Sequence, residues 1–204
     1  MIAKGKNQLS AEIDFMYETY TNLITRIKKT YQDDIRNIRK DILSIESDAS
    51  IDAIEKQTLL SPYYSLEDKI FEESLNLTIG LFVSIFSFWE KSLLLCCKFF
   101  NKPITDTSNI EDYLNALLEP NEIECLPELL VKRLDELRNY STHGSLPSRR
   151  QTILKHIVKK ENIGLIEING EFFFTSFNDL QRILDIIYKT LTKIKDLQVE
   201  NRNT

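Results

Sequence analysis

Arg138 and His143 are the residues of this chain whose types and spacing best suit catalysis. They bound the run Arg138-Asn-Tyr-Ser-Thr-His143, and His143 is one of only two histidines among 204 residues. A histidine titrates near neutral pH and can move protons, whereas an arginine stays charged and its planar guanidinium suits phosphate oxygens. Together they could support metal-free attack of an RNA 2′-hydroxyl on its own phosphate, which leaves a 2′,3′-cyclic phosphate.

Helical geometry limits how these two side chains can cooperate. Pro127 and Gly144 are placed to start and end one helix, so His143 falls in its last turn. Positions five apart on a helix differ by roughly 140° in direction, so Arg138 and His143 do not share a face. Asn139 lies four positions before His143, shares its face and could orient the imidazole. A two-fold homodimer would bring two copies of each group to one cleft.

The charge around this run favours an anionic substrate. The chain carries a net charge of −5, but residues 131–160 hold eight basic residues against two acidic ones, a local charge of +6. Arg149, Arg150 and Lys155 belong to this stretch and are the predicted contacts to RNA phosphates. A solvated helix face followed by a basic loop would have the same composition without any binding function.

The run from Arg138 to His143 resembles the Arg-x4–6-His motif of the HEPN superfamily, small helical domains that include RNA-cutting toxins and defence nucleases. The resemblance implies a metal-independent endoribonuclease, a toxin or antiphage-defence effector, that acts at a composite dimer site. It also implies an RNA substrate and an antitoxin or regulatory protein as partner. The stretch Ser84-Ile-Phe-Ser-Phe-Trp-Glu90 is similar to a helix with an embedded acidic residue in several HEPN families, so Glu90 is a candidate supporting residue.

Two observations keep other interpretations open. In HEPN toxins paired with nucleotidyltransferase antitoxins, a tyrosine that receives an inhibitory nucleotide typically follows two positions after the histidine, and here Ser145 stands there. An arginine and a histidine before a helix-ending glycine also form a favourable cationic helix terminus without any chemistry. The alternative function is a non-catalytic HEPN-like scaffold subunit that docks a protein partner.

A long N-terminal helix is predicted from apolar residues that recur about every 3.6 positions between Ile13 and Ile45. Residues 46–64 contain a proline and several Ser and Asp residues, and are predicted to form a loop, with a short helix around residues 51–58 as an alternative within it. The chain is therefore divided into the N-terminal helix with its linker, residues 1–64, and a HEPN-like domain, residues 65–204.

The second helix is predicted to start at Ser65 and to run to about Phe100. Its second half, from Leu77, is apolar on nearly every face, which is typical of a helix with more than one apolar neighbour. We predict that this helix is the core of a bundle and also meets a second subunit; the alternative is the central helix of a monomer. The uncharged stretch 76–89 is shorter than the roughly 20 residues that span a bilayer, so burial and no membrane contact are predicted.

The remaining elements complete an all-α prediction. A short helix is predicted over residues 110–118, a β-hairpin over residues 163–175, and a last helix from Ser176 to about Leu197. The expected fold is a HEPN-like helical bundle with a long N-terminal helix and a small β-hairpin insertion.

Neither a metal ion nor a cofactor is expected. The three cysteines, Cys96, Cys97 and Cys125, lack the spacing of metal ligands, and no glycine-rich phosphate-binding loop is present. The N-terminal residues lack an apolar signal region, which together with the cysteine pattern predicts a cytoplasmic location.

Overall fold

The computed structural model describes residues 2–105, 107–127, 129–133, 138, 165–168, 171–174 and 176–200 of the chain. The elements in chain order are α1 (Ile2–Ser47), α2 (Ala53–Phe99), α3 (Ile110–Leu117), α4 (Pro120–Glu124), the π-helical turn η1 (Leu129–Arg133), β1 (Leu165–Ile168), β2 (Glu171–Phe174) and α7 (Phe177–Glu200). The structure is predominantly helical, in agreement with the predicted all-α class.

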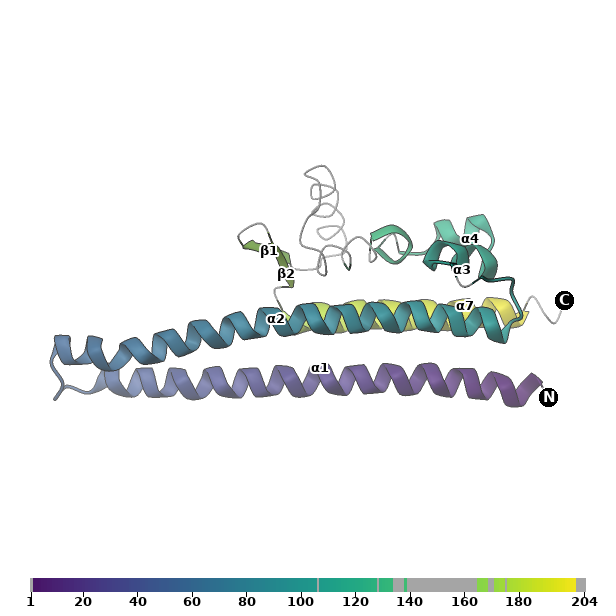
Figure 1. The fold of residues 1–204 in the computed structure, drawn as a ribbon. Helices are drawn as coiled ribbons and strands as arrows, with labels where there is room; N and C mark the ends of the chain where they lie inside the picture. The colour runs from purple at the N-terminus through teal and green to yellow at the C-terminus, as the bar shows by residue number, and fades with distance from the viewer. Residues whose placement is uncertain are drawn as a thin grey trace.

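Three long helices dominate the architecture. α1 and α2 form an antiparallel hairpin, and α7 lies alongside the second half of α2 (Figure 1). α7 contacts both other helices, so this part of the molecule is a three-helix bundle. α3 and α4 lie at the end of the bundle where both chain termini are found (Figure 1). Beyond the first residue of α7, α1 and α2 continue as an arm in which they are the two helices that the structure describes; the arm is defined here as residues 32–47 and 53–70.

The predicted loop at residues 46–64 is too long, and the helix considered around residues 51–58 is the start of a much longer one. The connection between α1 and α2 spans only residues 48–52, and α2 runs without interruption through the predicted start at Ser65. The expected division of the chain at residue 64 therefore falls inside α2.

Capping and packing explain why α2 begins so early. The Asp52 carboxylate accepts hydrogen bonds from the backbone N–H groups two and three residues later, each at 2.9 Å, and so satisfies donors at the helix start. Pro62 lies inside α2, where its ring removes one helical hydrogen bond. Leu60 packs with Ile38 and Ile42 of α1 in a small core of the arm, and this burial offsets the local cost.

The core of the bundle is built by one face of each long helix. On α2, the residues Phe82, Ile85, Trp89 and Leu93 are all 0% exposed. On α7, the predicted apolar face is confirmed, because the following residues are also 0% exposed: Leu180, Ile183, Leu184, Ile187, Leu191 and Ile194. α7 begins directly after Ser176, whose hydroxyl donates to the Asp179 carboxylate at 2.9 Å.

Polar contacts fix the register between α1 and α7. Tyr17 donates its hydroxyl hydrogen to Asp185 at 2.8 Å, and Tyr188 donates to Asp14 at the same distance. The two tyrosine rings stack with their centroids 4.2 Å apart. Burial, and then the bond to Asp185, raise the pKa of Tyr17. Each tyrosine thus buries a ring and places its hydroxyl on a carboxylate of the facing helix.

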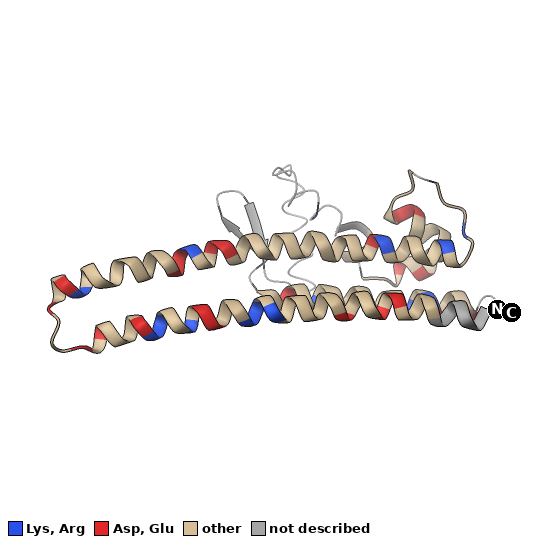
Figure 2. Ribbon diagram, turned by 60° about the horizontal axis from the view of Figure 1, so that its bottom comes forward, with Lys and Arg blue, Asp and Glu red and all other residues tan. Residues whose placement is uncertain are grey.

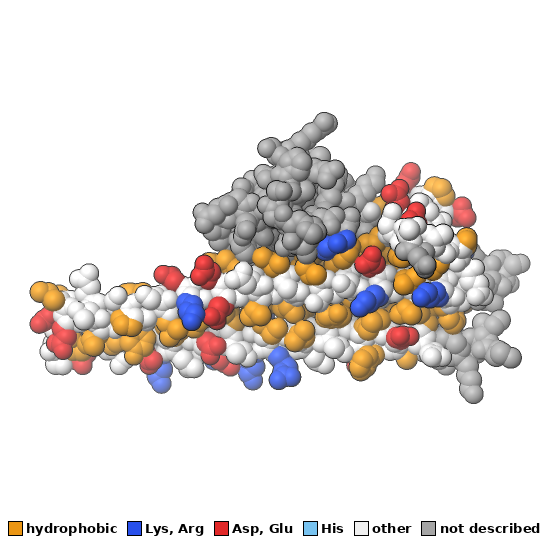
Figure 3. All heavy atoms as spheres, in the orientation of Figure 1, with side chains coloured by type: hydrophobic (Ala, Val, Ile, Leu, Met, Phe, Trp, Pro, Cys, Tyr) orange, Lys and Arg blue, Asp and Glu red, His pale blue; other side chains and the backbone are white. Residues whose placement is uncertain are grey.

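Several elements of the chain pack on the apolar second half of α2. α1, α3, α7 and β2 all contact α2 and cover its buried side chains. By length and composition α2 could cross a membrane, but half of its most apolar window is buried by the rest of the chain, as in the core helix of a soluble protein. Hydrophobic side chains also follow the line where α1 and α2 meet at the surface (Figure 3).

The short elements complete the described part. α3 agrees with the helix predicted for residues 110–118, and Asn109 begins it with a reciprocal capping box to Asp112. β1 and β2 pair antiparallel within the segment 163–175, with Leu165 opposite Phe174 at one end and Ile168 opposite Glu171 at the other.

The three cysteines should differ sharply in reactivity. Cys96 and Cys97 are buried, and burial raises the pKa of their thiols to about 12 and about 11, whereas Cys125 is exposed. Because the thiolate is the reacting form, Ellman's reagent at pH 8 should titrate one thiol rapidly in the native protein and three in guanidinium. The variant Cys125→Ser should show no rapid phase, and rapid titration of a second native thiol would contradict the packing of α2.

Candidate functional site

Arg138 is the predicted catalytic residue that lies within the described part of the chain. It is helical and half-buried, and its Cζ atom lies 4.9 Å from the centroid of the Phe86 ring. The face of an aromatic ring attracts a cation, by about 0.5 kcal/mol at exposed sites and about 2 kcal/mol where the pair is desolvated. The guanidinium is thus held against α2.

Phe86 is a rigid platform for this cation. Its side chain is 2% exposed, and its helix neighbour Ile85 is completely buried. Two residues further, on roughly the opposite side of α2, the ring of Phe88 packs against Tyr20 of α1 with centroids 5.8 Å apart, which helps to fix the rotation of α2 about its own axis. The placement of Arg138 over α2 therefore depends on the packing of the whole α1–α2 hairpin.

Glu90 follows Phe86 by four residues, so the two side chains share one face of α2. Glu90 is half-buried and lies near Tyr113 of α3. Burial of the phenol is the main cause of a raised pKa at Tyr113, and the negative charge of Glu90 raises that pKa further. The structure thus brings Arg138 and Glu90 to the same side of α2.

A cation held over an aromatic ring and a carboxylate four residues further along the same helix can serve two tasks. The guanidinium can bind phosphate oxygens in a defined orientation, because its position does not change when the substrate arrives. The carboxylate of Glu90 can accept a hydrogen bond from a neighbouring donor and so orient it. Among the described residues, no group of three or more His, Cys, Asp or Glu is close enough to hold a metal ion.

The other predicted site residues lie outside the described residues. They are His143, Asn139, Arg149, Arg150 and Lys155. Of the helix that was predicted to start at Pro127, the structure describes η1 and Arg138, and Arg138 is helical. The geometry between the guanidinium of Arg138 and the imidazole of His143 therefore stays a prediction.

Sequence reasoning missed two residues of this site. Phe86 lies in the same run as Glu90, and the four-residue spacing could have indicated that an aromatic ring shares the face of the acidic residue. No local signal could have indicated Tyr113, because its approach to Glu90 depends on the path of the chain between α2 and α3.

No protein-family model matches this chain, and neither a curated protein nor a solved structure is significantly similar to it. The comparisons therefore assign no family. Any functional conclusion has to come from the Arg138–His143 motif and from the surroundings of Arg138.

Proposed function

We propose that this chain is a HEPN-like endoribonuclease that cleaves RNA through attack of a 2′-hydroxyl on the adjacent phosphate, without a metal ion. Arg138 stabilises the charge that develops on the phosphorane, His143 transfers protons and Asn139 orients the imidazole. The observation that carries the proposal is the guanidinium of Arg138 over the ring of Phe86. It supports catalysis because a cation that is already in position does not have to be reorganised during the reaction.

The proposed site is composite and belongs to a homodimer. Because Arg138 and His143 are five positions apart on a helix, one copy presents them in directions that differ by roughly 140°, and a second copy completes the cleft. Arg149, Arg150 and Lys155 bind the RNA backbone. We place the protein in the cytoplasm as a toxin or antiphage-defence effector, controlled by an antitoxin or regulatory partner.

RNA cleavage in EDTA tests this proposal. We expect the purified chain to cut single-stranded RNA in the presence of EDTA and to leave 2′,3′-cyclic phosphate ends, detected by mass spectrometry. The matched control is the same oligonucleotide with 2′-deoxy residues, which should stay intact because it lacks the attacking hydroxyl. Cleavage of the deoxy control, or activity that EDTA abolishes, would require a different mechanism.

The composite site has its own test. Light scattering on the sample that cleaves RNA should give the mass of two chains, about 48 kDa from a chain of 23.9 kDa. A chain that stays monomeric at assay concentration and still cleaves RNA would contradict the shared cleft while leaving the reaction itself in place.

A scaffold subunit that docks a protein partner is the second candidate. One observation favours it: the arm extends beyond the bundle, and α1 there carries a hollow with both apolar and basic side chains. The absence of RNA cleavage together with partner binding at the arm would favour this function over the nuclease.

A further inference from the structure

One face of α2 is not buried within the chain. Six positions follow one another along it at spacings of four, three, four, three and four residues, which keeps them on a single face of the helix. None of the six is among the buried residues of α2, whereas Phe82 and Trp89, on other faces, are 0% exposed. We call this row the seam, and its members are Glu73, Leu77, Gly80, Ser84, Ser87 and Lys91.

The seam is uncharged between its two ends. Figure 2 shows α2 without acidic or basic side chains over a long stretch, which in the sequence is residues 74–89. Leu77 is 47% exposed on this stretch. Ser84 donates its hydroxyl hydrogen to the backbone carbonyl of Gly80 at 3.0 Å, so this hydroxyl keeps a partner when water is removed. The middle of the seam can therefore be desolvated at little cost.

Gly80 is not explained by packing within the chain. A glycine in the middle of a helix is unfavourable relative to alanine, because it loses more backbone freedom on folding. Apart from its own turn of the helix, a Cβ atom at this position would meet no atom within 4 Å. Nothing in the chain thus requires the Cβ atom to be absent, whereas a second helix that approaches the seam closely would require it.

The seam is complementary to itself when it is read in the opposite direction. If two copies of α2 lie antiparallel about position 82, Glu73 of each copy faces Lys91 of the other. In the same register, the small residues Gly80 and Ser84 face each other at the centre. A parallel pair would instead place Glu73 against Glu73 and Lys91 against Lys91, and like charges in contact are destabilising. The charges thus select an antiparallel second copy.

The residues next to the seam extend the match. Ile70 and Leu94 continue the alternating spacing at the two ends, both are half-buried, and they face each other in the same antiparallel register. Glu73 also lies 3.9 Å from Lys69 on its own helix. Both of these side chains are more than 60% exposed, so this pair contributes little and does not compete strongly with a cation of a second copy.

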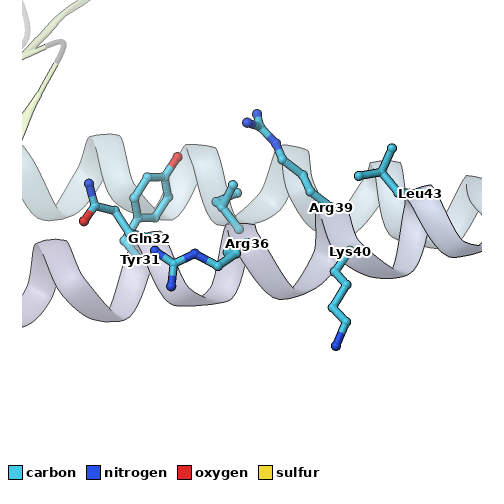
Figure 4. A pocket seen from close by; sticks show the side chains of 7 residues that line it. Tyr31, Gln32, Arg36, Arg39, Lys40 and Leu43 are labelled. Carbon is cyan, nitrogen blue, oxygen red and sulfur yellow. The ribbon is translucent and has the colours of Figure 1, made fainter.

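The arm offers no comparable surface. The described residues that line its hollow of about 630 Å³ all belong to α1. Lys40 points away from Arg39 and Leu43 there (Figure 4), and Arg39 is already paired with Glu67 at 2.8 Å. These side chains do not converge, whereas the residues of the seam share one face of α2.

We propose that a second copy of this chain packs antiparallel on the seam, with a two-fold axis that passes position 82 of α2. The inference rests on the homodimer of the proposed function and names the surface that forms it. A two-fold axis that exchanges antiparallel helices is perpendicular to both, so groups on one side of the helix pair stay on that side.

This symmetry brings the two candidate sites together. Phe86 lies four residues from the axis and, five positions before Lys91, roughly 140° away from the seam around α2. The two Phe86 rings, each beneath an Arg138 guanidinium, therefore lie on the same side of the dimer and roughly 12 Å apart along the helix direction. Each copy thus contributes its cation to one shared side of the assembly.

Sedimentation velocity on Gly80→Leu is the first test. We expect the wild type to sediment as two chains, and Gly80→Leu to weaken this association by at least about tenfold, because the new side chain blocks the close approach of the helices. Leucine favours a helix more than glycine does, and at this position it meets open space in the single chain. The helical content by circular dichroism should therefore not fall.

Reversing the charge at one end of the seam is the second test. Glu73→Lys and Lys91→Glu should each weaken self-association by at least about tenfold at low ionic strength, because like charges then face each other at both ends. Mixed in equal amounts, the two variants should form a two-chain species, since one has only basic and the other only acidic ends. Glu72→Lys is the matched control: it is exposed, lies about 100° away from Glu73, and should associate like the wild type.

Four outcomes overturn the proposal: a wild type that stays monomeric at about 100 μM, association that Gly80→Leu leaves unchanged, charge variants that do not pair when mixed, or an equal loss in Glu72→Lys. Because the readout is mass, it is separate from RNA cleavage. A dimer with this behaviour that cuts no RNA removes the nuclease and leaves the seam. RNA cleavage by a dimer that these variants do not weaken removes the seam and leaves the nuclease.

Discussion

Replacing Arg138 by alanine should slow RNA cleavage in EDTA by about 100- to 1,000-fold, the usual effect of removing one preorganised group that stabilises transition-state charge. The guanidinium of Arg138 rests on the ring of Phe86. A flexible cation nearby could supply the charge, but it would not be held in the same orientation. Arg138→Lys should recover only part of the rate, because a lysine keeps the charge but not the planar pair of donors. The measurement is kcat on one RNA oligonucleotide at constant salt.

Replacing His143, the second residue of the motif, by alanine should reduce the rate of RNA cleavage by about 100- to 10,000-fold, the range expected for a general acid or base. Arg26→Ala, at an exposed position of α1, and His156→Ala, the other histidine, are the matched controls and should stay within a fewfold of the wild type. Equal activity in Arg138→Ala, His143→Ala and both controls would remove the catalytic role of the motif. Circular dichroism on each variant separates loss of activity from loss of fold.

Leu93→Ala should lower the free energy of unfolding by about 2–5 kcal/mol, because it leaves a cavity in the core of the bundle. Leu93 is completely buried in the main core. The matched control is Leu77→Ala on the same helix, where the side chain is 47% exposed and the expected loss is below about 1 kcal/mol.

Urea titrations followed by circular dichroism measure both variants. For Leu93→Ala, the midpoint should fall while the slope with denaturant stays unchanged, since the surface exposed on unfolding is nearly the same. Similar losses in the two variants would mean that the second half of α2 is not the centre of the bundle.

Local sequence patterns were sufficient to predict the helices that bury one continuous face. The apolar residues of α7 recur at helical spacing, and all six predicted core positions are completely buried. α3 was predictable from Asn109 and Asp112, because a capping box acts over three residues and needs no distant partner. Most of the apolar stripe of α1 is likewise buried or half-buried, although Leu23 is 40% exposed.

Local patterns failed where distant packing decides. Pro62 and its polar neighbours favour a loop on propensity, yet α2 passes through them because Leu60 reaches Ile38 and Ile42 across the hairpin. The contact between Arg138 and Phe86 could not be predicted from local patterns either, because the two residues are 52 positions apart and no spacing rule connects them.

Periodicity in the sequence establishes which side of each helix is buried, because residues three and four apart share a face in any α-helix. Periodicity does not show which residues of other elements pack against that face. The tertiary structure alone decides that α7 begins beside Tyr31, so that α7 does not extend along the arm, and that a phenylalanine lies beneath Arg138. Both outcomes depend on how three helices are positioned against one another, which is a property of their packed side chains together rather than of any one segment.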